Sequence, residues 1–400
     1  MIKVAVLGYG TVGSGVVQVL QDNSEIISAR LGEDIEVKYI LDLRDFPGDK
    51  NEDKVVHDIK VILDDPEVSI VCETMGGVRP AFQFSKDALL AGKSVCTSNK
   101  ELVENYGPEL IKTARENKVN YLFEASVGGG IPILRSINTA LAQEKIERIM
   151  GILNGTTNFI LTKMAKEGAD YSDVLKLAQE MGYAERNPEA DVEGHDAGRK
   201  IAILSSLITG KTVKFADIHT EGITQIDTRD FAYAKKLNKS IKLIAEAKNE
   251  EDGVTAIVAP FMIGEDHPLN GVNGVFNAVY VTGNMLGDAM FYGQGAGKLA
   301  TASAVVGDVI DLARNAGRDL PCVWDEKKCV VKDYTKAVRK FMLRVESTSR
   351  GEVLNTFGPI EEINLFDEEF AFITAAMTEE EFSKKCKQVK NIIKAIRMAD

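Results

Sequence analysis

A short stretch of the sequence holds three carboxylates and a lysine: Glu185, Asp191, Asp196 and Lys200. Asp196 and Lys200 are four residues apart, so in a helix they share one face, in the acid-before-base order that favours pairing. Such a cluster can bind an ammonium group through its carboxylates while the lysine handles a proton. A surface helix with an ordinary salt bridge explains the same charge pattern, and from the pattern alone it is the simpler interpretation.

A glycine-rich turn near the N-terminus can bind a phosphate. Gly8, Gly10 and Gly13 follow a strand-like run and precede a helix-like one, the context in which G-x-G-x-x-G predicts dinucleotide binding. Gly8 would permit the tight turn, and Gly10 would let the backbone approach a pyrophosphate. Gly13 would allow close packing of helix on strand. The helix N-terminus would supply N–H donors. We favour this over a plain flexible turn. The predicted cofactor-binding residues here are Gly8, Tyr9, Gly10, Thr11, Val12 and Gly13.

The type of nicotinamide cofactor depends on two residues that follow the second predicted strand, Asp42 and Arg44. Asp42 can accept both ribose hydroxyls, which favours NAD. Arg44 can clamp a 2′-phosphate, which favours NADP. A solvated ion pair on a surface loop would explain both residues without any cofactor. On balance the sequence favours NAD and leaves NADP open.

Three further loops carry residues suited to a site. Ser98 and Lys100 follow a predicted strand at its carboxyl end, where open sheets bind ligands, so Lys100 can point toward the nicotinamide; a helix cap and a surface lysine are the alternative. The run Asn154–Asn158, which includes Thr156, can offer donors to a carboxylate or simply cap a helix. The loop that ends in Gly297 is either a lid over the cofactor or a plain turn.

Composition narrows the class of protein. The chain has 400 residues, 44% of them hydrophobic and 27% charged, and a formal net charge of −12. This charge opposes non-specific attraction to phosphate polymers and anionic lipid, so we expect no nucleic acid and no membrane as a partner. We find no membrane-spanning apolar run and expect no signal or transit segment. The five cysteines and four histidines lack metal-site spacing, so we expect a cytoplasmic protein without structural zinc.

The order of elements predicts how these residues are positioned. Short apolar runs alternate with helix-like patterns from residue 2 to about residue 125, which predicts an α/β fold with a Rossmann-type, doubly wound parallel sheet. The strands expected there are Ile2–Leu7, Ile35–Leu41, Ser69–Cys72, Ser94–Thr97 and Asn120–Phe123. The helices expected there are Thr11–Arg30, Pro80–Ala91 and Pro108–Asn117.

Further along, β-rich stretches flank a long helical region over Tyr171–Gly210, which predicts an α+β domain for substrate binding and dimerisation. The expected limits are 1–130 for the dinucleotide-binding domain, joined by a helix over 299–318, and 131–298 for the second domain. Residues 334–400 read as a small appended module. Its expected elements are strands at Phe341–Glu346 and Glu369–Ala375, a helical turn at Gly351–Phe357 and a helix at Glu379–Met398.

Six segments together resemble the homoserine dehydrogenase family, and they occur in the family's order. They are GYGTVG from Gly8, TSNK ending at Lys100, EASVGGGIPI from Glu124, ILNGTTNFIL from Ile152, GYAERNPEADVEGHDAGRK ending at Lys200, and YGQGAG from Tyr292. Each segment alone is weak evidence, but six in order are specific. The resemblance therefore overturns the salt-bridge interpretation of the stretch that ends at Lys200.

The family reduces L-aspartate 4-semialdehyde to L-homoserine with NADH or NADPH, on the route to threonine, methionine and isoleucine. The resemblance implies that Lys200 donates the proton to the carbonyl oxygen and that Asp196 holds Lys200 and contacts substrate. It also implies that Lys100 bridges cofactor and substrate. Hydride delivery to an aldehyde leaves negative charge on oxygen, which a nearby ammonium can both stabilise and protonate.

For the small-molecule substrate, the resemblance implies that Glu185 binds the ammonium group, that Asp191 supports the polar pocket and that Thr156 helps to position the molecule. It also implies an alkali cation, Na⁺, held largely by backbone carbonyls. The residues matching that cation loop are Glu124, Val127, Gly129 and Ile131.

The tail resembles a shortened ACT-type regulatory module. Ser349 and Arg350 replace the usual acidic residue before its glycine turn, so we prefer dimer stabilisation to amino-acid sensing as its role. We expect a homodimer, because the second domain carries an apolar sheet.

Other interpretations remain open. Another Rossmann amino-acid dehydrogenase would share the glycine turn, and a semialdehyde dehydrogenase would need a nucleophilic cysteine, for which Cys72 and Cys96 lie in unsuitable apolar runs. A non-catalytic dinucleotide sensor is the third alternative. Lys100 and Lys200 argue against it, because a sensor needs no paired proton donors.

Overall fold

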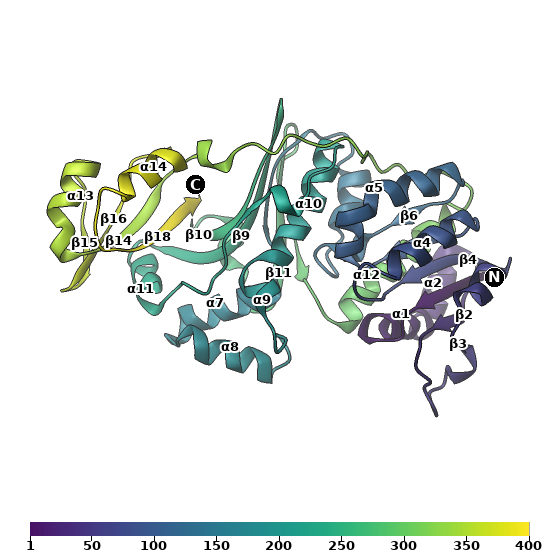
Figure 1. Cartoon of the computed structure of the whole chain (residues 1–400). Helices are drawn as coiled ribbons and strands as arrows, with labels where there is room; N and C mark the ends of the chain where they lie inside the picture. Colours follow the sequence, from purple (N-terminus) through teal and green to yellow (C-terminus); the bar gives the residue numbers. More distant parts are fainter. Residues whose placement is uncertain (400) are drawn as a thin grey trace. The chain divides into compact units, whose positions relative to one another are not determined.

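The structure is a computed structural model that describes residues 1–399, and these fall into two compact units (Figure 1). Unit 1 comprises Met1–Lys145, Ala202–Phe215 and Phe291–Cys329. Unit 2 comprises Ile146–Ile201, Ala216–Met290 and the residues from Val330 onward. Each unit is therefore discontinuous in sequence. Among the helices that residues 1–399 form, none has the length and apolar character needed to cross a membrane.

A six-stranded parallel sheet forms the centre of unit 1, in the order β3-β2-β1-β4-β5-β6. Its strands are β1 Ile2–Leu7, β2 Ile35–Leu41, β3 Val55–Val56, β4 Val68–Glu73, β5 Ser94–Thr97 and β6 Tyr121–Leu122. The last four residues of β1 are fully buried, as expected of a parallel strand covered on both faces. Strand order reverses between β1 and β4, and ligands bind such sheets at the carboxyl ends around this point. The predicted doubly wound sheet is confirmed.

The helices of unit 1 are α1 Thr11–Asp22, α2 Ser24–Leu31, α3 Ile59–Leu63, α4 Ala81–Leu90, α5 Lys100–Glu116, α6 Ile133–Arg135 and α12 Lys298–Arg314. Helix α6 continues as a π-helical turn over Ser136–Ala140. Although α12 is distant in sequence, it packs beside α1 (Figure 1). The approach is close: a Cβ on Gly15 would lie 2.8 Å from the Lys298 carbonyl oxygen. A segment far along the chain thus supports the first βα turn.

One helix expected in unit 1 is divided in two. The prediction of a single helix over Thr11–Arg30 is wrong, because α1 ends before Asn23 and α2 starts at Ser24. Short polar side chains compete with the helical backbone for hydrogen bonds, so an Asn-Ser pair favours a break. Asn23 is the C-cap residue of α1 and the N-cap residue of α2.

A second helix is longer than expected. Helix α5 starts at Lys100 and not at Pro108, because the Asn99 side chain caps it by accepting a backbone N–H at 3.0 Å. Pro108 lies inside α5 and has no N–H for the Glu104 carbonyl. The Lys214 ammonium donates to that carbonyl at 2.8 Å, which replaces the missing hydrogen bond.

A ten-stranded sheet forms the centre of unit 2, in the order β12-β11-β7-β9-β10-β18-β14-β16-β15, with β8 also paired to β10. Its strands are β7 Ile146–Ile152, β8 His219–Thr220, β9 Lys239–Glu250, β10 Gly253–Gly264, β11 Phe276–Gly283, β12 Gly287–Gln294, β14 Phe341–Glu346, β15 Ile363–Phe366, β16 Glu369–Ile373 and β18 Ile392–Ala399. A separate pair consists of β13 Val338–Arg339 and β17 Met377–Thr378. This mixed sheet confirms the predicted α+β character.

The helices that begin in unit 2 are α7 Gly155–Glu167, α8 Tyr171–Glu180, α9 Glu189–Val192, α10 His195–Thr209, α11 Thr228–Lys236, α13 Arg350–Phe357 and α14 Glu379–Cys386. The helical region predicted over Tyr171–Gly210 is thus interrupted. Gly194 separates α9 from α10 with a φ of +80°, a conformation that glycine adopts without strain. The break places Asp191 and Asp196 on different helices.

The tail differs from expectation at its end. The helix predicted over Glu379–Met398 stops at Cys386, and Ile392–Ala399 form strand β18 instead. β18 pairs with β10 on one side and β14 on the other, so backbone pairing outweighs the local helix preference of its lysine and alanine. The tail therefore extends the sheet of unit 2. Its likeness to an ACT module and the domain limits 1–130, 131–298 and 334–400 stay predictions.

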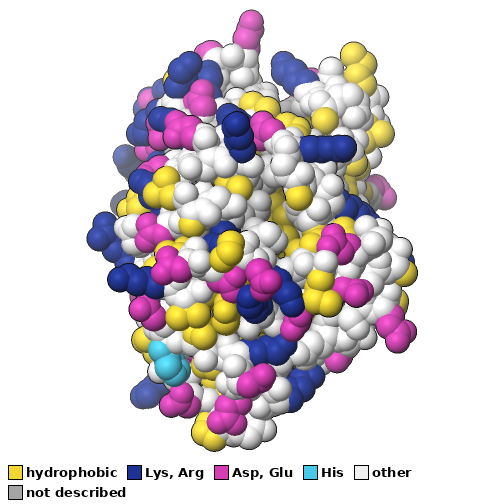
Figure 2. All heavy atoms as spheres, turned by 90° about the vertical axis from the view of Figure 1, so that its right-hand side faces the viewer, with side chains coloured by type: hydrophobic (Ala, Val, Ile, Leu, Met, Phe, Trp, Pro, Cys, Tyr) yellow, Lys and Arg dark blue, Asp and Glu magenta, His cyan; other side chains and the backbone are white. Residues whose placement is uncertain are grey.

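Charges are mixed on the surface that Figure 2 presents. Basic and acidic side chains are interspersed there, with apolar side chains between them. On this face a surface of mixed sign steers anions weakly.

Candidate active site

The glycine turn follows β1 in unit 1 and opens α1. Gly8 has a φ of +90°, and a Cβ on Gly13 would lie 1.9 Å from the Gly8 carbonyl oxygen, so both positions require glycine. Gly10 caps α1 without any side-chain hydrogen bond, and a Cβ there would meet nothing within 4 Å. The first N–H groups of a helix have no partner within the helix, and the space beside Gly10 is open. This arrangement fits the pyrophosphate of a dinucleotide.

Asp42 joins the turn to the end of β2. Its carboxylate accepts the Tyr9 N–H at 2.8 Å. It also accepts the backbone N–H, Nε and Nη2 of Arg44, each at 3.0 Å. Hydrogen bonds from Arg44 hold the pKa of the Asp42 carboxyl well below its usual range, against the effect of burial. The two residues that favour opposite cofactors are thus paired with each other.

A buried carboxyl joins the loops after β4 and β5. Glu73 ends β4 with no exposed surface and accepts hydrogen bonds from the Met75 N–H, at 2.7 Å, and the Thr97 hydroxyl. Burial raises the pKa of Glu73 to about 7. Asn99 donates its amide to the carbonyl of Gly77 at 2.6 Å. Glu73 and Asn99 therefore fix the two loops at the carboxyl end of the sheet.

Ser98 and Lys100 lie in this fixed region. Ser98 N–H donates to the Glu73 carbonyl at 3.3 Å, and Lys100 is the first residue of α5, half-buried. Sequence reasoning identified these two residues but missed Glu73. The available signal was an acidic residue that closes a buried apolar run.

Two glycine loops from distant parts of the sequence meet in unit 1. The Gly130 N–H donates to the Gln294 carbonyl at 3.0 Å, and a Cβ on Gly129 would lie 2.5 Å from Gly295. Ile131 packs against Gly293 in the same contact. Because α12 begins at Lys298 directly after the second loop, Gly297 lies next to the helix that packs on α1. The structure thus connects the second glycine loop to the cofactor turn.

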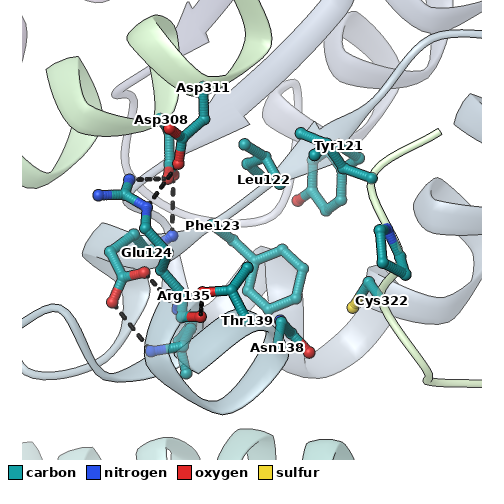
Figure 3. A pocket seen from close by; sticks show the side chains of 13 residues that line it. Tyr121, Leu122, Phe123, Glu124, Arg135, Asn138, Thr139, Asp308, Asp311 and Cys322 are labelled. Carbon is teal, nitrogen blue, oxygen red and sulfur yellow. Dashed lines mark hydrogen bonds and ion pairs between the residues drawn. The ribbon is translucent and has the colours of Figure 1, made fainter. Parts of the chain in front are cut away.

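Charged side chains fix Glu124, which precedes the first of these loops. Both carboxylate oxygens of Glu124 accept backbone N–H groups, from Leu134 at 2.9 Å and Arg135 at 2.6 Å. Arg135 pairs with Asp308 and Asp311 of α12, on one side of a small cavity (Figure 3). Burial and the charge of Glu124 raise the pKa of Asp308 to about 8. The Glu124 carboxylate is thus committed to backbone donors.

In unit 2, one asparagine links both acids of the predicted substrate cluster. Asn154 ends the segment after β7, and its amide donates to Asp191 at 2.7 Å and to Asp196 at 2.9 Å. Its carbonyl oxygen caps α7 by accepting the Thr157 N–H at 2.8 Å. Burial and the nearby charge of Asp196 raise the pKa of Asp191. The sequence predicted that this segment caps a helix, but it did not predict that Asn154 bridges the two acids.

Lys200 completes this cluster. Its ammonium donates to Asp196 at 2.6 Å and to the Leu153 carbonyl at 2.7 Å. Both charged side chains are buried: Asp196 is 6% and Lys200 8% exposed. The pair is therefore not the solvated surface salt bridge that the charge pattern alone suggests.

The remaining predicted substrate residues lie nearby in sequence but differ in surroundings. The Thr156 hydroxyl donates to the Tyr183 carbonyl at 2.6 Å, which ties α7 to the loop that carries Glu185. Glu185 itself is exposed in that loop, with its carbonyl accepting from Gln179. The structure thus brings Asp191, Asp196 and Lys200 together and leaves the Glu185 carboxylate at the surface. Among residues 1–399, no three His, Cys, Asp or Glu side chains form a metal-binding group.

Comparisons with known proteins point to one family. A family model described as homoserine dehydrogenase matches residues 132–310, and one described as its NAD binding domain matches residues 8–124. A homoserine dehydrogenase of Bacillus subtilis is 43% identical over 318 residues, which is 78% of this chain and 73% of the relative.

Solved structures give the same result. A homoserine dehydrogenase from Thiobacillus denitrificans has a TM-score of 0.91 at 34% identity, covering 100% of this chain and 98% of its own. A hyperthermophilic archaeal homoserine dehydrogenase, solved in complex with NADPH, has a TM-score of 0.66 at 27% identity. It covers 80% of this chain and 99% of its own.

Proposed function

The chain belongs to the homoserine dehydrogenase family, and on that premise we propose that Lys200 is the proton donor of its reaction. The enzyme is an NAD(P)-dependent oxidoreductase that reduces L-aspartate 4-semialdehyde to L-homoserine in amino-acid biosynthesis. The observation that carries the proposal is the buried contact of the Lys200 ammonium with Asp196 and the Leu153 carbonyl. An ammonium has three N–H donors, so one remains for a substrate carbonyl oxygen.

The chemistry follows from charge. NAD(P)H, when bound, supplies the hydride, and negative charge develops on the aldehyde oxygen as the carbonyl carbon accepts it. Lys200 stabilises that oxygen and then gives it a proton, and Asp196 keeps the lysine in place during the transfer. Lys100, at the start of α5, contacts both cofactor and substrate in this proposal.

The acids select the substrate. Asp191 and Asp196 together carry one more negative charge than Lys200 neutralises when both are ionised, so an ammonium group balances the cluster. Glu185, from the exposed loop, adds a further carboxylate around the same ammonium. Thr156 positions the substrate through that loop, because its hydroxyl holds the Tyr183 carbonyl.

The test is oxidation of NADH or NADPH with L-aspartate 4-semialdehyde. We expect Lys200→Ala to lower kcat by about 1000-fold or more, with little change in cofactor binding. Lys163→Ala is the matched control, because Lys163 forms an exposed i,i+4 pair with Glu167 on α7 and should leave kcat unchanged. A Lys200→Ala enzyme with full kcat would refute the assignment.

NAD is the preferred cofactor in our proposal, and its binding residues are the turn Gly8–Gly13 together with Asp42, Arg44, Ser98, Lys100 and Gly297. The position of Asp42 supports this preference, since it already accepts the Tyr9 N–H beside the turn. Arg44 gives two of its five N–H donors to Asp42, so its charge is already paired there.

A monovalent cation, Na⁺, is proposed at the loop of Glu124, Val127, Gly129 and Ile131. Support comes from Glu124, whose carboxylate is occupied by backbone donors, so backbone carbonyls would be the ligands. Replacing Na⁺ with a bulky organic cation at constant ionic strength should lower activity or stability. Equal behaviour in both salts would contradict the site.

A homodimer and a cytoplasmic location complete the proposal. Strand β12 is the last strand on one side of its sheet, and large exposed apolar side chains lie on it and before it: Met285, Leu286, Met290 and Tyr292. Such an edge favours pairing with a second copy. Met290→Glu should shift the mass measured by light scattering from dimer to monomer. None of the five cysteines is in a disulfide, which supports a reducing compartment.

A further inference from the structure

The junction between α9 and α10 carries both acids of the substrate cluster. Asp191 lies in α9 and Asp196 in the first turn of α10, with Val192, Glu193, Gly194 and His195 between them. The Gly194 carbonyl accepts the Gly198 N–H of α10 at 2.9 Å, so the junction also sets where that helix begins. Any displacement here changes the spacing of the two carboxylates that share Asn154.

The loop Thr220–Thr224 packs against this junction. The Ile223 N–H donates to the Val192 carbonyl at 2.8 Å, and the Thr224 hydroxyl donates to Glu193 at 3.1 Å. The approach is so close that a Cβ on Gly222 would lie 2.3 Å from the Val192 carbonyl oxygen. The loop therefore supports the junction through three consecutive residues.

Glu221 ties the loop to the tail. Its carboxylate accepts two N–H groups of Arg397 at 2.7 Å each and contacts His219 at 2.7 Å. Arg397 lies on β18, and its remaining donors hold Glu379 of α14 at 2.7 and 2.8 Å. The Glu221 N–H donates to Val258 of β10, the strand that β18 pairs with. The planar guanidinium of Arg397 binds Glu221 and Glu379 at once, so it holds the loop and α14 rigidly together.

We propose that Arg397 is a positioning residue for the substrate site: through Glu221 and the loop Thr220–Thr224 it fixes the spacing of Asp191 and Asp196. The tail strand thereby takes part in substrate binding without contacting the substrate. This inference rests on the proposed role of the two acids in holding the substrate ammonium.

The chain of contacts from Arg397 to Asp191 and Asp196 predicts a specific effect on substrate and cofactor binding. It ends at the substrate acids in unit 2, and the cofactor turn belongs to unit 1. Loosening the connection should therefore raise the KM for the semialdehyde and leave the Kd of NADPH unchanged. A purely structural role would lower thermal stability without this difference between substrate and cofactor.

The decisive variant is Glu221→Gln, because it weakens the pair while Arg397 keeps Glu379 as a partner. We expect the KM for the semialdehyde to rise about tenfold, with the Kd of NADPH, from fluorescence titration, within twofold. Arg397→Gln should raise KM similarly, and the double variant should add little, because both changes remove one interaction. Arg350→Gln is the control: Arg350 also holds a glutamate, Glu362, through two N–H groups, at 2.7 and 3.0 Å, elsewhere on the tail.

Two results would overturn the inference: a Glu221→Gln enzyme with unchanged KM, or one in which KM and the Kd of NADPH rise together. Asp191→Asn, measured alongside, separates a failure of the proposed Arg397 role from a failure of the proposed substrate site. If Asp191→Asn raises KM and Glu221→Gln does not, only the role of Arg397 fails. If Asp191→Asn leaves KM unchanged, the proposed substrate site itself fails.

Discussion

The cofactor turn of unit 1 and the acid cluster of unit 2 are built differently. In unit 1 the cofactor turn is backbone: three glycines form it, the space beside Gly10 is open, and no side chain caps α1. In unit 2 the acid cluster is side chain: Asn154, Asp191, Asp196 and Lys200 hold one another in place. A backbone site should be sensitive to added volume. A side-chain cluster should be sensitive to any change of donor or acceptor.

Apart from the loss of Lys200, the largest expected effect comes from adding one methyl group to the backbone site. Gly13→Ala would place a Cβ 1.9 Å from the Gly8 carbonyl, so the turn must distort. We expect NADPH affinity to fall by about 100-fold or more, together with a lower Tm. Gly10→Ala has room in the protein, so it should weaken NADPH binding at normal Tm, because its methyl meets only the cofactor. Gly351→Ala on the tail is the control and should change neither quantity.

The side-chain cluster can be tested at Asn154, which both caps α7 and bridges two acids. We expect Asn154→Ala to lower kcat/KM by about 10- to 100-fold and to lower Tm as the cap is lost. Asn154→Ser keeps an oxygen that can cap a helix but lacks the amide that reaches Asp191 and Asp196. Serine should therefore restore Tm and leave kcat/KM low. Full recovery of kcat/KM with serine would show that the bridge is unimportant.

A buried acid in unit 1 gives a pH-dependent prediction. Because burial raises the pKa of Glu73 from 4.5 to about 7, the folded enzyme holds a proton there that the unfolded chain has released between these values. Its contribution to the free energy of unfolding should fall as pH rises through that window, by at most about 3 kcal/mol, and then level off. Urea unfolding at pH 5 and pH 8 should show a smaller difference for Glu73→Gln than for the wild type. Exposed Glu116→Gln should leave that difference unchanged.

The smallest effect is expected at the edge of the cofactor site. Asp42→Ala should weaken the use of NADH more than that of NADPH, by about three- to tenfold, because the ribose hydroxyls lose their acceptor. Steady-state KM values for both cofactors measure this. The reverse order would show that Arg44, released from its ion pair, dominates the choice.

Much of the fold could be predicted because local pattern and final structure agree. Strands Ile2–Leu7, Ile35–Leu41, Ser94–Thr97 and Phe341–Glu346 have the expected limits, since buried β-branched runs have few alternatives. The glycine turn was predictable for a similar reason: its chemistry is contained in six consecutive residues.

Other features depend on partners that sequence spacing does not reveal. The role of Asn154 needs two acids from different helices, and the burial of Glu73 needs the neighbouring strand. Strand β18 contains residues that also suit a helix, and it is a strand because it pairs with β14 and with the part of β10, Phe261–Ile263, that β8 leaves uncovered.

The placement of β18 also bears on how the protein folds. It is an interior strand of the ten-stranded sheet, between β10 and β14, yet both neighbours are synthesised before it. Until β18 emerges from the ribosome, each neighbour presents an open edge on which another chain can pair. Joining β10 to β18 also closes a long loop of chain, which slows folding. The nascent enzyme is therefore exposed to aggregation late in translation, and chaperones that bind extended segments would find their target here.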